Sequence, residues 1–157
     1  MLFRTCLIAL CIGGVTAAVS AAPPTGDDAC SLLTTAQVSA ATSTPMGDGV
    51  YMMPTFRKTC TWTASQPAPQ GVKIVTVSFE GLDMFTGGMN ASRNPGVSTT
   101  AVSGIGDSAY YLVSGGIAAL HIRKGGLALK VAVYAKLPPE QVEAMERKLA
   151  LQVVPRI

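Results

Sequence analysis

The stretch that decides the fold is SAYYLVSGGIAALHIRKGGLALKVAVYA, residues 108–135. It contains three strand-like runs of mostly apolar residues, separated by Gly115-Gly116 and Gly125-Gly126. Two-residue Gly-Gly connections suit tight hairpin turns, because glycine reaches positive φ without a steric penalty. The stretch therefore predicts a three-stranded antiparallel meander.

Two further strands are predicted before this meander. In KTCTWTAS, residues 58–65, Cys60 and Trp62 alternate with threonines, which is the period of a half-buried strand. After the turn sequence QPAPQG, the run VKIVTVSFE places Val75, Val77 and Phe79 on one face. The pattern therefore predicts a sheet of about five strands.

Two short helices are predicted around these strands. Thr34 and Gln37 have the spacing of a capping box, which satisfies backbone donors at a helix start, and predict a helix over residues 35–42. Residues 83–95 have apolar side chains at roughly helical spacing, but Gly87-Gly88 costs about 1 kcal/mol per glycine relative to alanine. We expect a short or broken helix there.

The C-terminal sequence LPPEQVEAMERKLALQVV, residues 137–154, predicts an amphipathic helix. Its prolines suit a helix start, and one stripe carries Val142, Met145, Leu149 and Val153. This helix should pack on the sheet together with the N-terminal one. The predicted fold is therefore α+β, an antiparallel sheet of about five strands with an N-terminal and a C-terminal helix on one face.

The first residues have the three parts of a secretory signal peptide over residues 1–21. Arg4 gives a positive start, residues 7–15 are apolar, and small residues precede a cleavage site after Ala21. Cys11 stands where a lipoprotein would be acylated, but Leu10 before it is larger than that signal requires. We expect a periplasmic or secreted protein without a lipid anchor.

After the leader, residues 22–29 are expected to be a disordered lead and residues 30–157 a single domain. Cys30 and Cys60 are the two cysteines left after cleavage, and an exported chain with two cysteines most simply forms one disulfide. Such a cross-link would stabilise the fold by roughly 3 to 4 kcal/mol in the chain-entropy model.

Charge and hydropathy exclude several partners. The formal net charge is only +3 at pH 7, and the basic residues occur singly or in pairs, without the stripe of a nucleic-acid binder. No run outside the leader approaches the roughly 18 apolar residues of a membrane span. A small ligand or another cell-envelope protein remains as the expected partner.

The sequence GIGDSAYY around Asp107 resembles a phosphate-binding loop at first. A strand-like run follows it instead of a helix, and no glycine occupies position 109 as a dinucleotide fingerprint requires. We therefore predict a structural turn in which Gly104 and Gly106 permit positive φ and the Asp107 side chain bonds to local backbone.

His121 is the one histidine of the chain and lies inside a predicted strand. Alternation places it on the face opposite Leu120 and Ile122, where a solvated or hydrogen-bonded imidazole is expected. A hydrolase would need His121 as its base, but nothing nearby in the sequence supplies its partners. Glu80 and Asp83 flank a glycine and fit the end of a strand better than a catalytic pair. We expect no enzyme, no cofactor and no metal.

Two binding hypotheses remain open. Tyr51, Met52, Met53 and Phe56 are apolar residues in a predicted loop, and with Phe85 they could bind a ligand or a protein. Alternatively, methionines could hold Cu(I) in an oxidising compartment. Those outside the regular elements are Met46, Met52, Met53, Met84 and Met89.

Several motifs together resemble a group of small actinobacterial cell-envelope lipoproteins of unknown function, which is similar to the extracellular sensor domain of a mycobacterial serine/threonine kinase. The motifs are DACSLLTTAQVSAA, CTW, VSGIGDSAYY and the closing amphipathic helix. The resemblance implies a disulfide between Cys30 and Cys60, with Trp62 beside it and GIGD as the turn before a central strand. It supplies no catalytic residues, and this chain lacks that group's lipidation cysteine.

Overall fold

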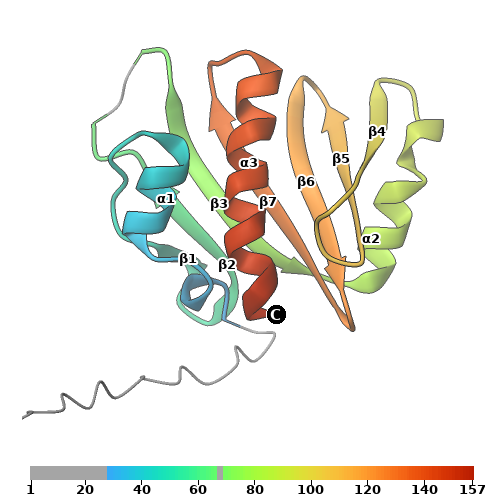
Figure 1. Cartoon of the computed structure of the whole chain (residues 1–157), viewed down its shortest axis with the longest axis horizontal. Coiled ribbons are helices and arrows are strands. Elements are labelled where there is room, and N and C mark those ends of the chain that lie inside the picture. The colour runs from blue at the N-terminus through green and yellow to red at the C-terminus, as the bar shows by residue number, and fades with distance from the viewer. Residues whose placement is uncertain (1–27, 67–68) are drawn as a thin grey trace, which may run out of the picture.

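The computed structural model describes residues 28–66 and 69–157 and has an α+β fold. Seven strands of the described residues form one antiparallel sheet in the order β1-β2-β3-β7-β6-β5-β4 (Figure 1). The strands are β1 (Val50–Met53), β2 (Phe56–Thr63), β3 (Val72–Glu80), β4 (Val97–Val102), β5 (Ser108–Ser114), β6 (Ile117–Lys124) and β7 (Leu127–Ala135). The helices are α1 (Thr35–Thr42), α2 (Leu82–Met89) and α3 (Pro139–Val153), with 3-10 turns η1 (Ala29–Ser31), η2 (Ala91–Arg93) and η3 (Val154–Arg156).

The predicted meander is confirmed as β5, β6 and β7. Antiparallel registers join β5 to β6 and β6 to β7, and each connection is a Gly-Gly pair. Gly115 and Gly116 have φ of 59° and 79°, so both occupy the left-handed region that a type I′ hairpin turn requires.

The prediction of about five strands was wrong, because the sheet has seven. The two additional strands are β1 and β4, which form the two edges. β1 contains Tyr51, Met52 and Met53, so the predicted loop is part of a hairpin that continues into Phe56 at the start of β2. Edge strands pair on one side only and bury little, so neither β1 nor β4 carries a clear alternation of apolar residues.

Helix α1 spans the predicted residues, and its capping box is present. The Gln37 backbone N–H donates to Thr34 Oγ1 at 3.2 Å, and the Thr34 backbone N–H donates to Gln37 Oε1 at 2.9 Å. The expected broken helix is α2 followed by η2. The prolines Pro138 and Pro139 begin α3 as predicted.

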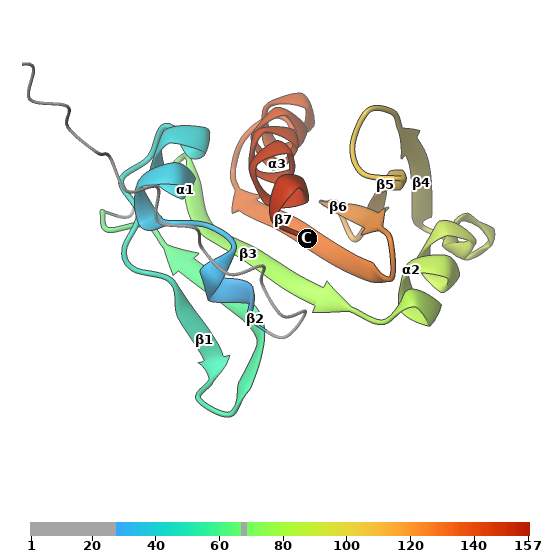
Figure 2. The ribbon, with the colours of Figure 1, turned by 60° about the horizontal axis from the view of Figure 1, so that its bottom comes forward.

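Helices α1 and α3 lie on the same face of the sheet (Figure 2). Helix α2 packs on the opposite face, where Phe85 contacts Tyr110 and Ala128. Gly88 permits this contact, because a Cβ at that position would lie 2.3 Å from the Tyr110 hydroxyl oxygen. The glycine that weakens α2 therefore allows it to approach the sheet.

The main core lies between the sheet and the helices α1 and α3. Trp62, Val75, Leu120 and Leu129 are among its fully buried members. The predicted disulfide joins Cys30 in η1 to Cys60 in β2, with Cα atoms 4.9 Å apart. Gly49 packs directly against it, because an added Cβ would lie 2.8 Å from both Cys60 Sγ and the Trp62 ring.

The predicted signal peptide and most of the lead that follows it lie outside the described residues. The last two residues of that lead are ordered: Asp28 accepts a hydrogen bond from Ser31 N–H, and Ala29 is buried in η1. Asp28 also forms an ion pair with Arg57. Among the described helices, none has the length and apolarity needed to cross a bilayer. The disulfide fits an extracellular compartment.

Candidate functional site

Strand β7 pairs differently with its two neighbours. Its register with β3 continues from Glu80↔Ala128 to Val72↔Ala135, over the whole length of the strand. Its register with β6 begins beside the Gly125-Gly126 turn but ends at Leu120↔Val131. β6 and β7 therefore separate towards their other ends, with α3 crossing the gap (Figure 1).

A helix side chain takes over the hydrogen bonding of β6 where the strands separate. If the register continued beyond Leu120↔Val131, Val133 would face Ala118, and its N–H would point towards β6. Instead, Val133 N–H donates to Glu146 Oε1 of α3 at 2.9 Å. The carboxyl group of Glu146 thus substitutes for a strand carbonyl.

Glu146 is an unusual buried acid. Its exposed fraction is 0%, and its Oε2 atom has no hydrogen-bond partner among the described residues. Burial raises the pKa of Glu146 to about 8; the hydrogen bond from Val133 opposes this rise, and the nearby Glu143 carboxylate adds to it. The group therefore stays mostly protonated at neutral pH.

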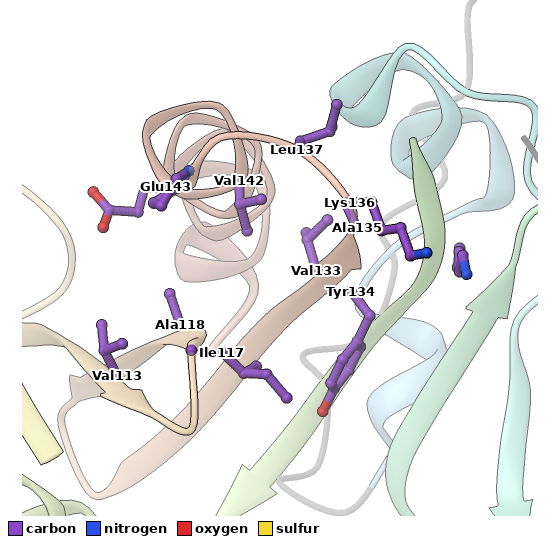
Figure 3. A pocket seen from close by; sticks show the side chains of 13 residues that line it. Val113, Ile117, Ala118, Val133, Tyr134, Ala135, Lys136, Leu137, Val142 and Glu143 are labelled. Atoms are coloured by element: carbon purple, nitrogen blue, oxygen red, sulfur yellow. The ribbon is translucent and has the colours of Figure 1, made fainter. Parts of the chain in front are cut away.

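A cavity of about 410 Å³ occupies the gap between β6 and β7 (Figure 3). Its apolar walls come from the β5–β6 hairpin, the end of β7 and the first turn of α3. The residues lining it are Lys73, Val113, Gly116, Ile117, Ala118, Val133, Tyr134, Ala135, Lys136, Leu137, Pro139, Val142 and Glu143. We call this cavity the split-sheet pocket.

The split-sheet pocket is lined from both faces of the sheet. Ala118 and Val133 belong to the face covered by α3, whereas Ile117 and Tyr134, the neighbouring residues along each strand, belong to the opposite face. Ile117 and Tyr134 reach towards each other in Figure 3. Both side chains are exposed, so they form an apolar mouth above a buried interior.

A second hollow of about 430 Å³ lies on the other side of α3, against β4 and β5. It is shallow, and Glu143 and Arg147 line it together with Tyr111. The Tyr111 hydroxyl donates to the Glu143 carbonyl oxygen at 2.7 Å. Burial raises the pKa of Tyr111, and the Glu146 and Glu143 carboxyl groups add to this rise. This hydroxyl therefore fastens α3 to β5.

The residues predicted to bind a ligand do not gather at one place. Met52, with an exposed fraction of 66%, Met53 and Phe56 lie on the β1–β2 hairpin, at one edge of the sheet. Tyr51 is partly covered there, and its hydroxyl donates to Asp28 Oδ1. Phe85 belongs to α2 and is 1% exposed where this helix packs on the sheet, so it is not part of any surface formed by the hairpin.

His121 is hydrogen-bonded, as expected, but its environment is more closed than predicted. Its exposed fraction is 8%, and its Nδ1 lies 2.9 and 3.1 Å from the two Glu80 carboxylate oxygens. Its ring stacks on Tyr110 with centroids 4.9 Å apart. Burial raises the pKa of Tyr110 to about 12, and Glu80 adds to that rise. No hydroxyl or thiol of the described residues bonds to His121, so no nucleophile accompanies it.

The GIGD sequence forms the turn before β5. Gly104 and Gly106 have φ of 77° and 58°, and Asp107 Oδ2 accepts a hydrogen bond from Gly125 N–H at 2.7 Å. β5, which follows this turn, pairs on both sides, with β4 and with β6. The expectation that Asp107 bonds to local backbone is wrong, because Gly125 lies in the turn between β6 and β7. Asp107 therefore fastens the β6–β7 turn, at the closed end of the gap.

The methionines considered for copper binding are dispersed. Met46 is buried in the core, Met52 and Met53 lie on β1, and Met84 and Met89 lie on α2. β1 and α2 stand at opposite ends of the sheet (Figure 1). In the part of the chain that the structure describes, no three His, Cys, Asp or Glu side chains are grouped to hold a metal ion.

The sequence pattern predicts neither the split-sheet pocket nor the role of Glu146. One signal for Glu146 was available: it lies four residues after Val142 and three before Leu149, on the buried stripe of α3. The apolar pattern instead places Met145 on the stripe, and this side chain is only partly buried. Comparison of the chain with protein-family models, curated proteins and solved structures found no match.

Proposed function

We propose that this protein is an exported, non-enzymatic module that binds a small apolar or amphipathic ligand in the split-sheet pocket. The observation that carries the proposal is the early end of the β6–β7 pairing, which opens an apolar cavity inside an otherwise continuous sheet. Its volume of about 410 Å³ falls within the range of small-molecule sites.

The energetics of the gap support this proposal. Closing β6 onto β7 would extend the strand pairing beyond Leu120 and Val131, yet Val133 N–H bonds to a carboxyl group of α3 instead. A buried carboxyl with an unpartnered oxygen costs free energy. Such a cost is typical of sites that are kept open for function.

The second candidate function is protein binding through the β1–β2 hairpin. It rests on a cluster of exposed large apolar side chains at the β1 edge of the described sheet, namely Val50, Met52, Met53 and Phe56. Edge strands with such side chains can accept a partner strand. A hydrolase site at His121 is less well supported, because the imidazole bonds to Glu80 without a nucleophile.

The neutral fluorescent compound N-phenyl-1-naphthylamine tests the pocket, because its emission rises on transfer to an apolar site. We expect saturable binding to the native protein. Ala118→Phe fills the pocket and should abolish binding, while the double variant Ile117→Ser with Tyr134→Ser removes the apolar mouth without touching the core and should weaken it.

The matched control is Val50→Ser with Met52→Ser, which removes two exposed apolar side chains from the hairpin. This control should bind the compound like the native protein. If the hairpin variant loses binding and the pocket variants keep it, the proposal is wrong and the second candidate gains support. Thermal unfolding of each variant verifies that it is folded.

A further inference from the structure

We infer that the ligand of the split-sheet pocket is an amphipathic anion, a molecule with an apolar chain and a carboxylate or phosphate head group. This inference rests on the proposed function and adds the chemical class of the ligand. Its basis is the placement of two lysines, Lys73 and Lys136, on the wall of a cavity that is otherwise mainly apolar.

Lys73 reaches the pocket because of an irregularity in β3. The register shifts between Val72↔Ala135 and Ile74↔Tyr134, so Lys73 is an extra residue with no partner of its own on β7. Such a bulge redirects a side chain out of the normal alternation. It allows Val72 to remain buried in the core while Lys73 lines the pocket.

Lys136 lies immediately after β7, and its backbone N–H donates to the Gly71 carbonyl oxygen beside the bulge. The two lysines therefore come from neighbouring chain segments at one end of the cavity. Neither forms a salt bridge with an acidic side chain of the described residues. Both residues are exposed, so their ammonium groups can meet a head group.

The remaining charged residue of the pocket wall is Glu143, which lies on α3. Figure 3 shows its carboxylate on the side of the cavity away from Lys136. The lysine end of the pocket thus carries two positive charges, whereas the interior between Ala118, Val133 and Val142 is apolar. An anion with an apolar chain matches this arrangement: its chain fills the interior, and its head group meets the lysines.

The test compares octanoate, octyl phosphate, octanol and octylammonium by displacement of N-phenyl-1-naphthylamine from the intact protein. We expect at least one of the two anions to bind more tightly than octanol, and octylammonium to bind more weakly. Comparing octanoate with octyl phosphate identifies the preferred head group. Raising the salt concentration should weaken binding of the anion and leave octanol unchanged.

The double variant Lys73→Ala with Lys136→Ala should lower the affinity for the preferred anion about tenfold, as expected for two solvent-exposed charge contacts. Its affinity for octanol should stay within about twofold. The control Lys130→Ala with Lys148→Ala removes the same charge outside the pocket and should change neither affinity.

Two results overturn the inference in distinguishable ways. Equal binding of anions and octanol, unaffected by the lysine substitutions, shows that the pocket takes apolar ligands without charge selection and leaves the proposed function standing. The proposed function and the inference are overturned together if none of the four compounds displaces N-phenyl-1-naphthylamine. The same holds if N-phenyl-1-naphthylamine itself does not bind.

Discussion

The two flanks of β7 show how one strand can be both a structural element and the wall of a site. On the β3 flank, Val133 pairs with Val75 within a register that covers the whole strand. On the β6 flank, the same residue donates its N–H to Glu146 of a helix. One flank is closed by a strand, the other is held open by a side chain.

The two flanks differ in which group accepts the hydrogen bonds of the β7 backbone. A buried N–H needs an acceptor, and in a sheet the neighbouring strand normally supplies it. When a helix carboxyl supplies it instead, the neighbouring strand is free to move away, and the space between the strands can hold a ligand. One polar residue on a helix stripe can therefore open a sheet locally without leaving Val133 N–H unpaired.

The change with the greatest effect on stability is a rise in pH, which acts through Glu146 on the β6 flank of β7. Burial raises the pKa of Glu146 to about 8 from an ordinary 4.5, so the folded state holds a proton that the unfolded state has lost between these values. The stability that this proton contributes is complete below pH 4.5 and is lost as the pH rises through 8. The free energy of unfolding therefore falls by as much as about 5 kcal/mol.

Urea unfolding of the native protein and of Glu146→Gln between pH 4 and 9 measures this effect. The glutamine keeps an acceptor for Val133 N–H but does not titrate, so the difference in unfolding free energy should grow in favour of the variant as the pH rises. Other titrating groups cancel because both proteins contain them. Parallel stability curves would show that Glu146 ionises freely in the fold.

The second largest effect on stability is expected from removing the carboxyl group that accepts the hydrogen bond of Val133 N–H. Glu146→Ala leaves Val133 N–H buried without a partner and creates a cavity under α3, which together cost about 2 to 4 kcal/mol. Unfolding at pH 5 is the appropriate measurement, because the native carboxyl is nearly cost-free there. Glu146→Gln at the same pH should stay within about 1 kcal/mol of the native protein, since it restores the acceptor. Equal losses in both variants would contradict the role given to the hydrogen bond.

The smallest effect concerns the closed end of the gap. Asp107→Asn keeps an oxygen that can accept from Gly125 N–H but removes the charge that strengthens this bond. We expect a loss of about 0.5 to 1 kcal/mol in thermal or urea unfolding, with ligand binding unchanged. A folded variant that no longer binds the fluorescent compound would instead place Asp107 in the site.

The parts of the fold that the sequence predicted are those with a strong local pattern. The meander follows from its Gly-Gly turns, α1 from the Thr34 and Gln37 capping box, and α3 from its prolines and apolar stripe. The disulfide follows from the cysteine count. In each case the residues that determine the structure are close in sequence or have no competing partner.

The parts that it did not predict depend on distant contacts. The edge strands β1 and β4 exist because a neighbouring strand is present to pair with them, and their own side chains show no clear period. The partner of His121 is Glu80, which is distant in sequence and comes from β3. The pocket arises where a register ends, and a register is a property of two strands and the helix above them.

Backbone NMR provides the most direct test of the claim that the open flank is the binding site. Amide resonances of the native protein are assigned and followed during titration with octanol, which isolates the apolar pocket from charge effects. We expect shifts concentrated in residues 117–119 of β6, 132–137 at the end of β7 and 140–146 of α3. Shifts centred on the β1–β2 hairpin, or none at saturating octanol, would contradict it.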